Sequence, residues 1–182
     1  MMYKEGRGVP RDERVAAMWF KKAARQGLVR AQVVLGEMYS EGVGVLKNDM
    51  EAVRWFRMAA KKGNASAQFN LGMSYANGEG VRKNERKAVL WYRKAAEQGY
   101  AAAQVGLAIM YWGGRGVPED IVKAYMWANL AAASGYDIGK ELRDKLEEEM
   151  ARNQIEKAQA MSREWLQRHA ADNRRDHPDE SP

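Results

Sequence analysis

The chain has 182 residues, of which 46% are hydrophobic, which is enough for one compact domain or a short repeat array. It contains no cysteine, and this excludes disulfide bridges, thiolate zinc sites and cysteine nucleophiles. The formal net charge is +6, but the lysine and arginine residues recur in step with the apolar residues. We therefore interpret them as a solvated outer face and predict no nucleic-acid partner.

The first residues hold no apolar signal region, and no stretch approaches the roughly 18 apolar residues of a membrane span. We predict no membrane insertion. As written the chain would be cytoplasmic, and it would be periplasmic or secreted if an upstream signal peptide has been removed.

A period of 36 residues, with no insertion, runs from Tyr3 to Gly135. A repeat of this length is typical of architectures in which each unit packs on its neighbours along the chain. The recurring positions are Tyr3, Tyr39, Tyr75 and Tyr111; Gly6, Gly42, Gly78 and Gly114; Gly8, Gly44, Gly80 and Gly116; Trp19, Trp55, Trp91 and Trp127; and Gly27, Gly63, Gly99 and Gly135.

Each unit predicts two helices. In the first, Ala31, Leu35 and Tyr39 share one face at 3.6 residues per turn. Gly36 and Gly72 follow the leucine and would let a neighbouring helix come close, whereas the fourth unit has Ala108 there. The second helix carries an apolar stripe, which is Ala52, Trp55, Phe56, Ala59 and Ala60 in the second unit.

The two helices are joined by a Gly-x-Gly-Val loop, in which the first glycine suits a helix C-terminus and the second permits a tight reversal. A phosphate site would need a preceding strand and a third glycine, so the loop is structural. An N-cap residue precedes each second helix: Asp12, Asn48, Asn84 and Asp120.

Each unit resembles the Sel-one-like repeat (SLR), a relative of the tetratricopeptide repeat, through the pattern Ala-x3-Leu-Gly-x2-Tyr-x2-Gly-x-Gly-Val-x2-Asp/Asn-x3-Ala-x2-Trp-Tyr/Phe-x2-Ala-Ala-x2-Gly. The resemblance covers residues 2 to about 136. It implies an all-α fold, a right-handed α/α superhelical solenoid of helix–turn–helix repeats. The segment from Leu142 to Trp165 resembles the C-terminal helices of bacterial members, although Ala151-Arg152-Asn153 stands where relatives often have Thr-Pro-Glu.

We therefore expect repeats over 1–136, one truncated and three complete, capping helices over 137–170 and a disordered tail over 171–182. We expect the N-terminal end to lack a cap, because most of the first helix of the first unit is missing, and one alternative is that the chain is a fragment of a longer array. Trp19 and Phe20 would lose cover there, so we predict self-association through this end or a neighbouring chain that supplies the helix.

No catalytic or metal-binding residue and no cofactor is predicted. The two histidines, His169 and His177, lie in the last residues, no serine is followed by lysine three residues later, and no Lys-Thr-Gly or phosphate-binding Gly-x-x-x-x-Gly-Lys-Ser/Thr occurs.

With no catalytic motif in the sequence, the candidate functional residues are those predicted on the surface. The resemblance implies that the first helix of each unit lines a concave groove, and a helical projection directs one set of residues away from the core stripe. Val33 and Val105 fall on that outward side. The predicted partner-binding residues are Glu37, Glu41, Phe69, Asn70, Met73, Asn77, Ile109 and Trp112. Phe69 could equally belong to the core. Trp112 replaces Ser40 and Ala76 of earlier units, and its alternative is packing near Leu142 and Leu146.

The sequence therefore predicts a non-enzymatic adaptor whose concave groove binds a protein or peptide, and the resemblance implies a bacterial scaffold or regulator. Two alternatives stay open: a cell-wall or β-lactam-directed hydrolase, which a chromogenic lactam would reveal, and a structural array segment that associates with itself, which light scattering would reveal.

Overall fold

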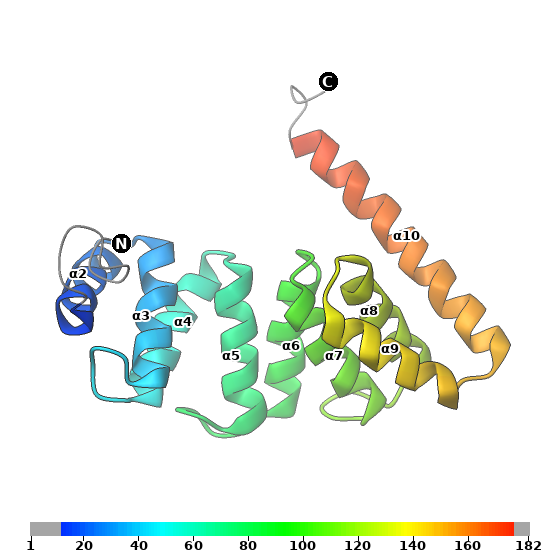
Figure 1. Cartoon of the computed structure of the whole chain (residues 1–182), viewed down its shortest axis with the longest axis horizontal. Helices are drawn as coiled ribbons and strands as arrows, with labels where there is room; N and C mark the ends of the chain where they lie inside the picture. Colours follow the sequence, from blue (N-terminus) through cyan, green and yellow to red (C-terminus); the bar gives the residue numbers. More distant parts are fainter. Residues whose placement is uncertain (1–11, 177–182) are drawn as a thin grey trace. The chain divides into compact units, whose positions relative to one another are not determined.

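The computed structural model describes residues 12–176, and within them every regular element is a helix. This confirms the predicted all-α solenoid of helix–turn–helix repeats (Figure 1). The helices are α2 (Glu13–Arg25), α3 (Val29–Glu41), α4 (Asp49–Lys61), α5 (Ala65–Asn77), α6 (Glu85–Ala96), α7 (Ala101–Trp112), α8 (Ile121–Ala133), α9 (Asp137–Glu149) and α10 (Arg152–Asp176). None of these helices is long and apolar enough to cross a bilayer.

The chain divides into two compact units, residues 1–100 and residues 101–182. The described part of the first unit holds α2–α6, and that of the second holds α7–α10. In each unit, helices that follow one another along the chain pack side by side across short connections. The exception is α10, which packs on α8 and not on α9.

The predicted N-caps are confirmed for all four second helices. The side chain of Asn48 accepts a hydrogen bond from the Glu51 amide at 3.1 Å, and that of Asn84 accepts one from the Lys87 amide at 2.9 Å. Asp12 and Asp120 cap α2 and α8 in the same manner. Each cap satisfies a backbone N–H that has no partner inside its helix.

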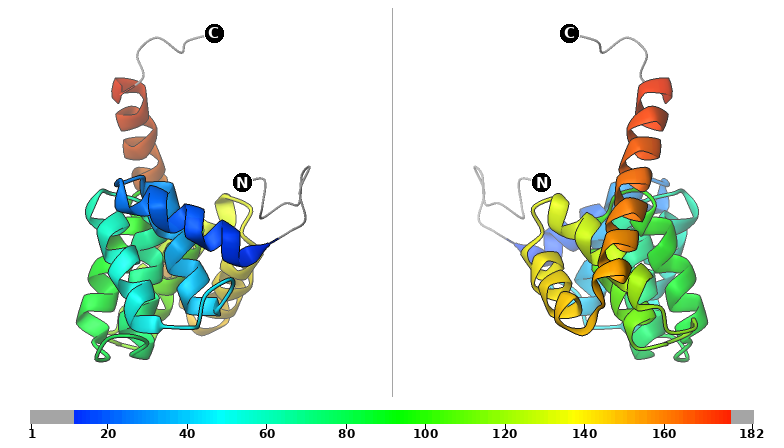
Figure 2. Two further views of the ribbon diagram at one scale, coloured as in Figure 1. Left: turned by 90° about the vertical axis from the view of Figure 1, so that its left-hand side faces the viewer. Right: turned by 90° about the vertical axis from the view of Figure 1, so that its right-hand side faces the viewer.

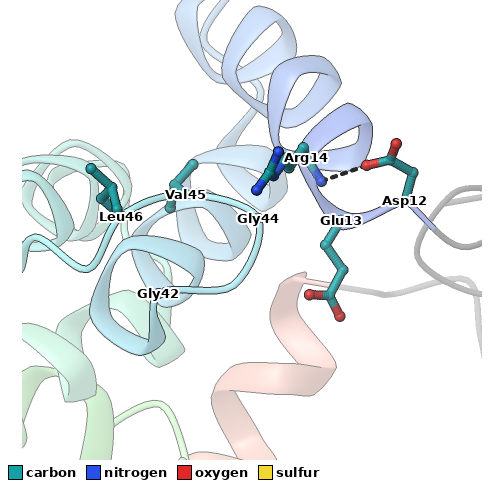
Figure 3. Close-up of a pocket in the computed structure, with 7 residues that line it drawn as sticks. All are labelled: Asp12, Glu13, Arg14, Gly42, Gly44, Val45 and Leu46. Atoms are coloured by element: carbon teal, nitrogen blue, oxygen red, sulfur yellow. Dashed lines mark hydrogen bonds between the residues drawn. The ribbon is translucent and has the colours of Figure 1, made fainter.

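The loop after α3 shows why both of its glycines are needed. Gly42 ends the helix with φ of 79°, and its N–H donates to the Met38 carbonyl at 2.9 Å. At Gly44 a Cβ atom would overlap the Glu13 carbonyl oxygen, because the loop crosses the start of α2 (Figure 3). The second glycine therefore permits a close approach between segments, in addition to the reversal.

The core of the first unit lies between consecutive helices. Leu35 of α3 and Trp55 of α4 form one buried cluster with Ala24 of α2, and Trp55 is 4% exposed. Phe56 of α4 belongs to a second cluster with Leu71 of α5. The predicted close approach is present, because a Cβ at Gly36 would lie 2.5 Å from the Phe56 ring.

The second unit packs around α8, which contacts α7, α9 and α10. Trp127 of α8 meets Trp165 of α10 edge-on, with 6.1 Å between ring centroids. Ser162 is buried and its hydroxyl donates to the Met126 carbonyl at 3.3 Å. Burial on several sides explains why α8 carries apolar residues around most of its circumference.

The C-terminal helix α10 extends to Asp176, beyond the boundary at residue 170 expected from the sequence. The residues from 171 to 176 include helix formers and no proline, and the first residue that breaks a helix is Pro178. In Figure 2 the C-terminal half of α10 rises clear of α8 and α9. The rest of the expected tail, 177–182, lies outside the described residues, as do Tyr3, Gly6 and Gly8 of the first unit.

Candidate partner-binding site

The residues predicted to bind a partner lie on the first helix of each complete repeat. Within the first unit, α3 carries Glu37 and Glu41, whereas α5 carries four of the predicted residues: Phe69, Asn70, Met73 and Asn77. Ile109 and Trp112 lie on α7 in the second unit.

Glu37 and Glu41 line one pocket of about 200 Å³ between α3 and α2. We call it the acidic pocket, and its described lining is Glu13, Ala16, Val34, Glu37, Met38, Glu41 and Val43. Three carboxylates therefore border an apolar floor. Glu37 is half-buried and Glu41 is exposed.

Helical spacing produces this arrangement. Glu37 and Glu41 lie one turn apart on α3, and Val34 and Met38 form a parallel row beside them. Glu13 lies in the first turn of α2, which packs against α3. Glu13 is not among the residues predicted from the sequence, and the signal for it is its acidic first-turn position beside the Asp12 cap.

The acidic pocket suits a long cationic side chain. The methylene groups of lysine or arginine pack on apolar atoms, while the charged end forms charge-assisted hydrogen bonds with carboxylates. Among the described residues, no group of three or more histidine, aspartate or glutamate side chains could hold a metal ion.

On α5 the predicted residues separate into interior and surface. Phe69 is half-buried, and its ring centroid lies 5.8 Å from that of Tyr92 and 5.5 Å from that of Tyr100. Its contacts are those of the core alternative. Met73 is 36% exposed, and exposed Asn77 donates from its amide to Glu79 at 3.2 Å. Asn70 is half-buried.

The helical projection was wrong for two valines that lie on the same helices as predicted site residues. It directed Val33 and Val105 outward, but both are buried, at 8% and 6% exposure. Val33 belongs to the cluster with Phe56 and Leu71. A first helix inside an array is packed from more than one side, so a residue opposite the main stripe can still be buried.

In the second unit, Ile109 is 41% exposed, whereas Trp112 is half-buried beneath the end of α9. The Trp112 indole N–H donates to a Glu149 carboxylate oxygen at 3.0 Å. The Lys145 ammonium lies 4.8 Å from the ring centroid, within the range of a cation–π interaction. Trp112 is thus held by α9, through the side chains of Lys145 and Glu149.

Two side chains of the second unit have displaced pKa values, and both are structural. Burial alone would raise the pKa of Asp120, but the hydrogen bonds and charge of Lys123 outweigh it and lower that pKa. Burial raises the pKa of the Tyr125 hydroxyl, and the negative charge of nearby Glu147 adds to the effect.

Stacked helix–turn–helix pairs define the class of helical-repeat proteins. The model of the Sel1 repeat matches residues 1–28, 29–64, 65–100 and 101–136. The chain therefore belongs to the Sel1 repeat family, whose repeats commonly mediate protein interactions and are generally non-catalytic.

Solved structures show the same fold. The chain is similar to c5321, a protective antigen present in uropathogenic Escherichia coli strains and displaying an SLR fold, with 36% identity and a TM-score of 0.86 over 100% of this chain. It is also similar to a Sel1 repeat protein from Oxalobacter formigenes, with 36% identity and a TM-score of 0.73 over 78% of this chain. The matches span 40% and 58% of those two proteins. No curated protein matches the chain.

Proposed function

We propose that this chain is a non-enzymatic adaptor that binds protein or peptide segments on the first helices of its repeats, which are α3 and α5 in the first unit and α7 in the second. The observation that carries the proposal is the acidic pocket, which brings Glu37 and Glu41 together with Glu13 over an apolar floor. A basic side chain of the partner enters this pocket. Such a pocket gives specificity for charge as well as contact area.

Apolar contacts come from the exposed side chains of the other first helices. Met73 on α5 is exposed, and methionine adapts its shape to different partners. Within the second unit, exposed Ile109 offers an apolar contact of its own on α7. Asn70 and Asn77 lie on α5 within one turn of Met73 and supply hydrogen-bonding groups.

Panning a random peptide library against the full chain tests this proposal. The selected peptides should be enriched in lysine or arginine next to apolar residues. Replacing Glu37 and Glu41 together by glutamine should weaken the best peptide about tenfold, because two charge-assisted contacts are lost. Measurement by fluorescence anisotropy at two salt concentrations should show weaker binding at the higher one.

A matched control is the pair Glu97→Gln and Glu141→Gln, which removes the same charge from exposed positions elsewhere. It should bind the peptide as the unmodified chain does. Selection of peptides without basic residues, or equal loss in both double variants, would show that the acidic pocket is not the binding site.

A second candidate, self-association, is favoured by the outer face of α2. Trp19 is 50% exposed, whereas the equivalent Trp55 and Trp127 are 4% and 7% exposed and Trp91 is half-buried. Met18 and Leu28 are also exposed, and the Lys22 ammonium lies 5.3 Å from the Trp19 ring centroid. We propose that this face pairs with the same face of a second copy.

Sedimentation equilibrium distinguishes the two states. The full chain should dimerise as its concentration rises, and Trp19→Glu should remain monomeric with unchanged far-ultraviolet circular dichroism. A chain that is monomeric at every concentration would refute self-association.

A further inference from the structure

A second pocket, of opposite charge, lies at the loop between α5 and α6 in the first unit. Its volume is about 500 Å³. We call it the basic pocket, and its described lining is Tyr75, Val81, Arg82, Lys83, Asn84 and Lys87. Three cationic side chains and no carboxylate therefore line it, together with the apolar surfaces of Tyr75 and Val81.

The positively charged side chains around Tyr75 differ in whether another group of the protein already interacts with them. The Arg57 guanidinium donates to the Tyr75 hydroxyl at 3.5 Å, and the Lys87 ammonium lies 5.4 Å from the Tyr75 ring centroid. Lys83 forms an exposed ion pair with Glu85 at 3.4 Å, which partly neutralises it. Arg82 is exposed and has no ion pair or hydrogen bond with a described residue, so its guanidinium is open to a ligand.

The other repeats show that this charge is not a requirement of the fold. The equivalents of Arg82 are Leu46 and Pro118, and the residue that replaces Lys87 in the second repeat is Glu51. The loop is nevertheless held by the same backbone hydrogen bond, from Asn84 to the Tyr75 carbonyl and from Asn48 to the Tyr39 carbonyl, at 2.8 Å in both.

Lys87 also lies at a helix position that disfavours a positive charge. It lies in the first turn of α6, where the positive end of the helix dipole disfavours a cation. In the fourth repeat the equivalent Lys123 is compensated by Asp120, whose carboxylate lies 2.7 Å away. The cap of α6 is the uncharged Asn84, and no carboxylate pairs with Lys87 among the described residues.

We propose that the basic pocket binds an acidic segment of a partner protein. Carboxylates of the segment pair with Arg82 and Lys87 in the positive field of the α6 N-terminus, and the methylene groups of glutamate pack on Val81 and Tyr75. Charge complementarity with apolar walls fits a peptide better than a bare anion. This inference rests on the proposed function only in taking the ligand to be a protein segment, and it adds a site apart from the acidic pocket.

The test uses the full chain and a short fluorescein-labelled peptide of alternating glutamate and glycine. The double variant Arg82→Leu/Lys87→Glu installs the residues of the second repeat and should keep the fold and melting temperature. It should weaken peptide binding about tenfold, because two attractive charges are lost and one repulsive charge is added. The control Arg30→Leu/Lys140→Glu has the same change in net charge at exposed positions and should weaken it far less.

Further arms separate this site from other ligands and from the acidic pocket. Glu37→Gln/Glu41→Gln should leave binding of the acidic peptide unchanged, so a failure of the proposed function is distinguishable from a failure here. Equal affinity of the unmodified chain and the Arg82→Leu/Lys87→Glu variant would overturn the proposal. So would Arg82-dependent binding of inorganic phosphate or phosphatidylglycerol vesicles in the absence of peptide binding.

Discussion

The second and third repeats join their helix pairs through glycine against an aromatic ring, whereas the fourth repeat uses alanine at both positions. A Cβ at Gly36 would lie 2.5 Å from the Phe56 ring, and one at Gly72 would lie 2.6 Å from the Tyr92 ring. In the fourth repeat, Ala108 and Ala128 occupy the equivalent positions and are fully buried. The two positions, twenty residues apart, therefore change size together.

The fourth repeat moves its aromatic ring one turn earlier along the second helix. Tyr125 is 2% exposed and stands where the earlier repeats have Val53 and Val89. Its hydroxyl donates to the Glu147 carboxylate on α9 at 3.2 Å. In the fourth repeat the close approach between helix backbones lies between α8 and α9, because a Cβ at Gly139 of α9 would lie 2.6 Å from the Ala131 Cβ. Phe56 of α4 lies against Gly36 of its own first helix and in a cluster with Leu71 of α5, whereas Tyr125 of α8 is joined to α9 by a hydrogen bond.

The largest effect is expected at Phe56. Replacement by alanine should lower the free energy of unfolding by about 3–5 kcal/mol, because the backbone at Gly36 cannot supply atoms to fill the cavity. Urea denaturation monitored by circular dichroism measures this loss. A loss below about 1 kcal/mol would mean that alanine is as good a partner for Gly36 as it is for Ala108.

The reciprocal change tests the alanine pair. Ala128→Phe should destabilise the chain by about 1–3 kcal/mol, because the ring meets the Ala108 methyl group. Adding Ala108→Gly should recover much of that loss. A double-mutant cycle gives the interaction energy, and additive effects would contradict size complementarity between the two positions.

The repeats also differ at the end of the first helix, where the fourth repeat has Trp112 and the second and third have Ser40 and Ala76. Replacing Trp112 by alanine should cost about 1–2 kcal/mol, through loss of the Glu149 hydrogen bond and the Lys145 cation–π interaction. Thermal melting measures the effect. An unchanged melting temperature with weaker peptide binding would instead assign the residue entirely to the binding surface.

The smallest effect concerns acid stability. The folded pKa of Asp120 lies below its ordinary value of 3.8, so its stabilising effect is present above that pH and is lost as the pH falls through the folded pKa. The asparagine caps of the second and third repeats do not titrate. Asp120→Asn should therefore flatten the acid side of the stability profile in urea titrations. At neutral pH it should cost less than about 1 kcal/mol, because the Lys123 ion pair is partly exposed.

Much of the fold could be predicted because its determinants are local or periodic. The caps Asn48 and Asn84 act within one helix turn, and Gly42 ends its helix through its own backbone angle. The close approach at Gly36 followed from comparing units that share one period. Glu37 and Glu41 could be named as candidate site residues because a helical projection uses only the spacing within one helix.

Only the tertiary structure decided which surfaces remain open. It brought Glu13 of α2 to the acidic pocket, placed Phe69 against Tyr92 and Tyr100, and covered Trp112 with α9. Helical periodicity describes the faces of one helix, but burial depends on how many neighbours that helix has. In a stacked array each first helix is packed from several sides, and residues distant in sequence settle which side faces solvent.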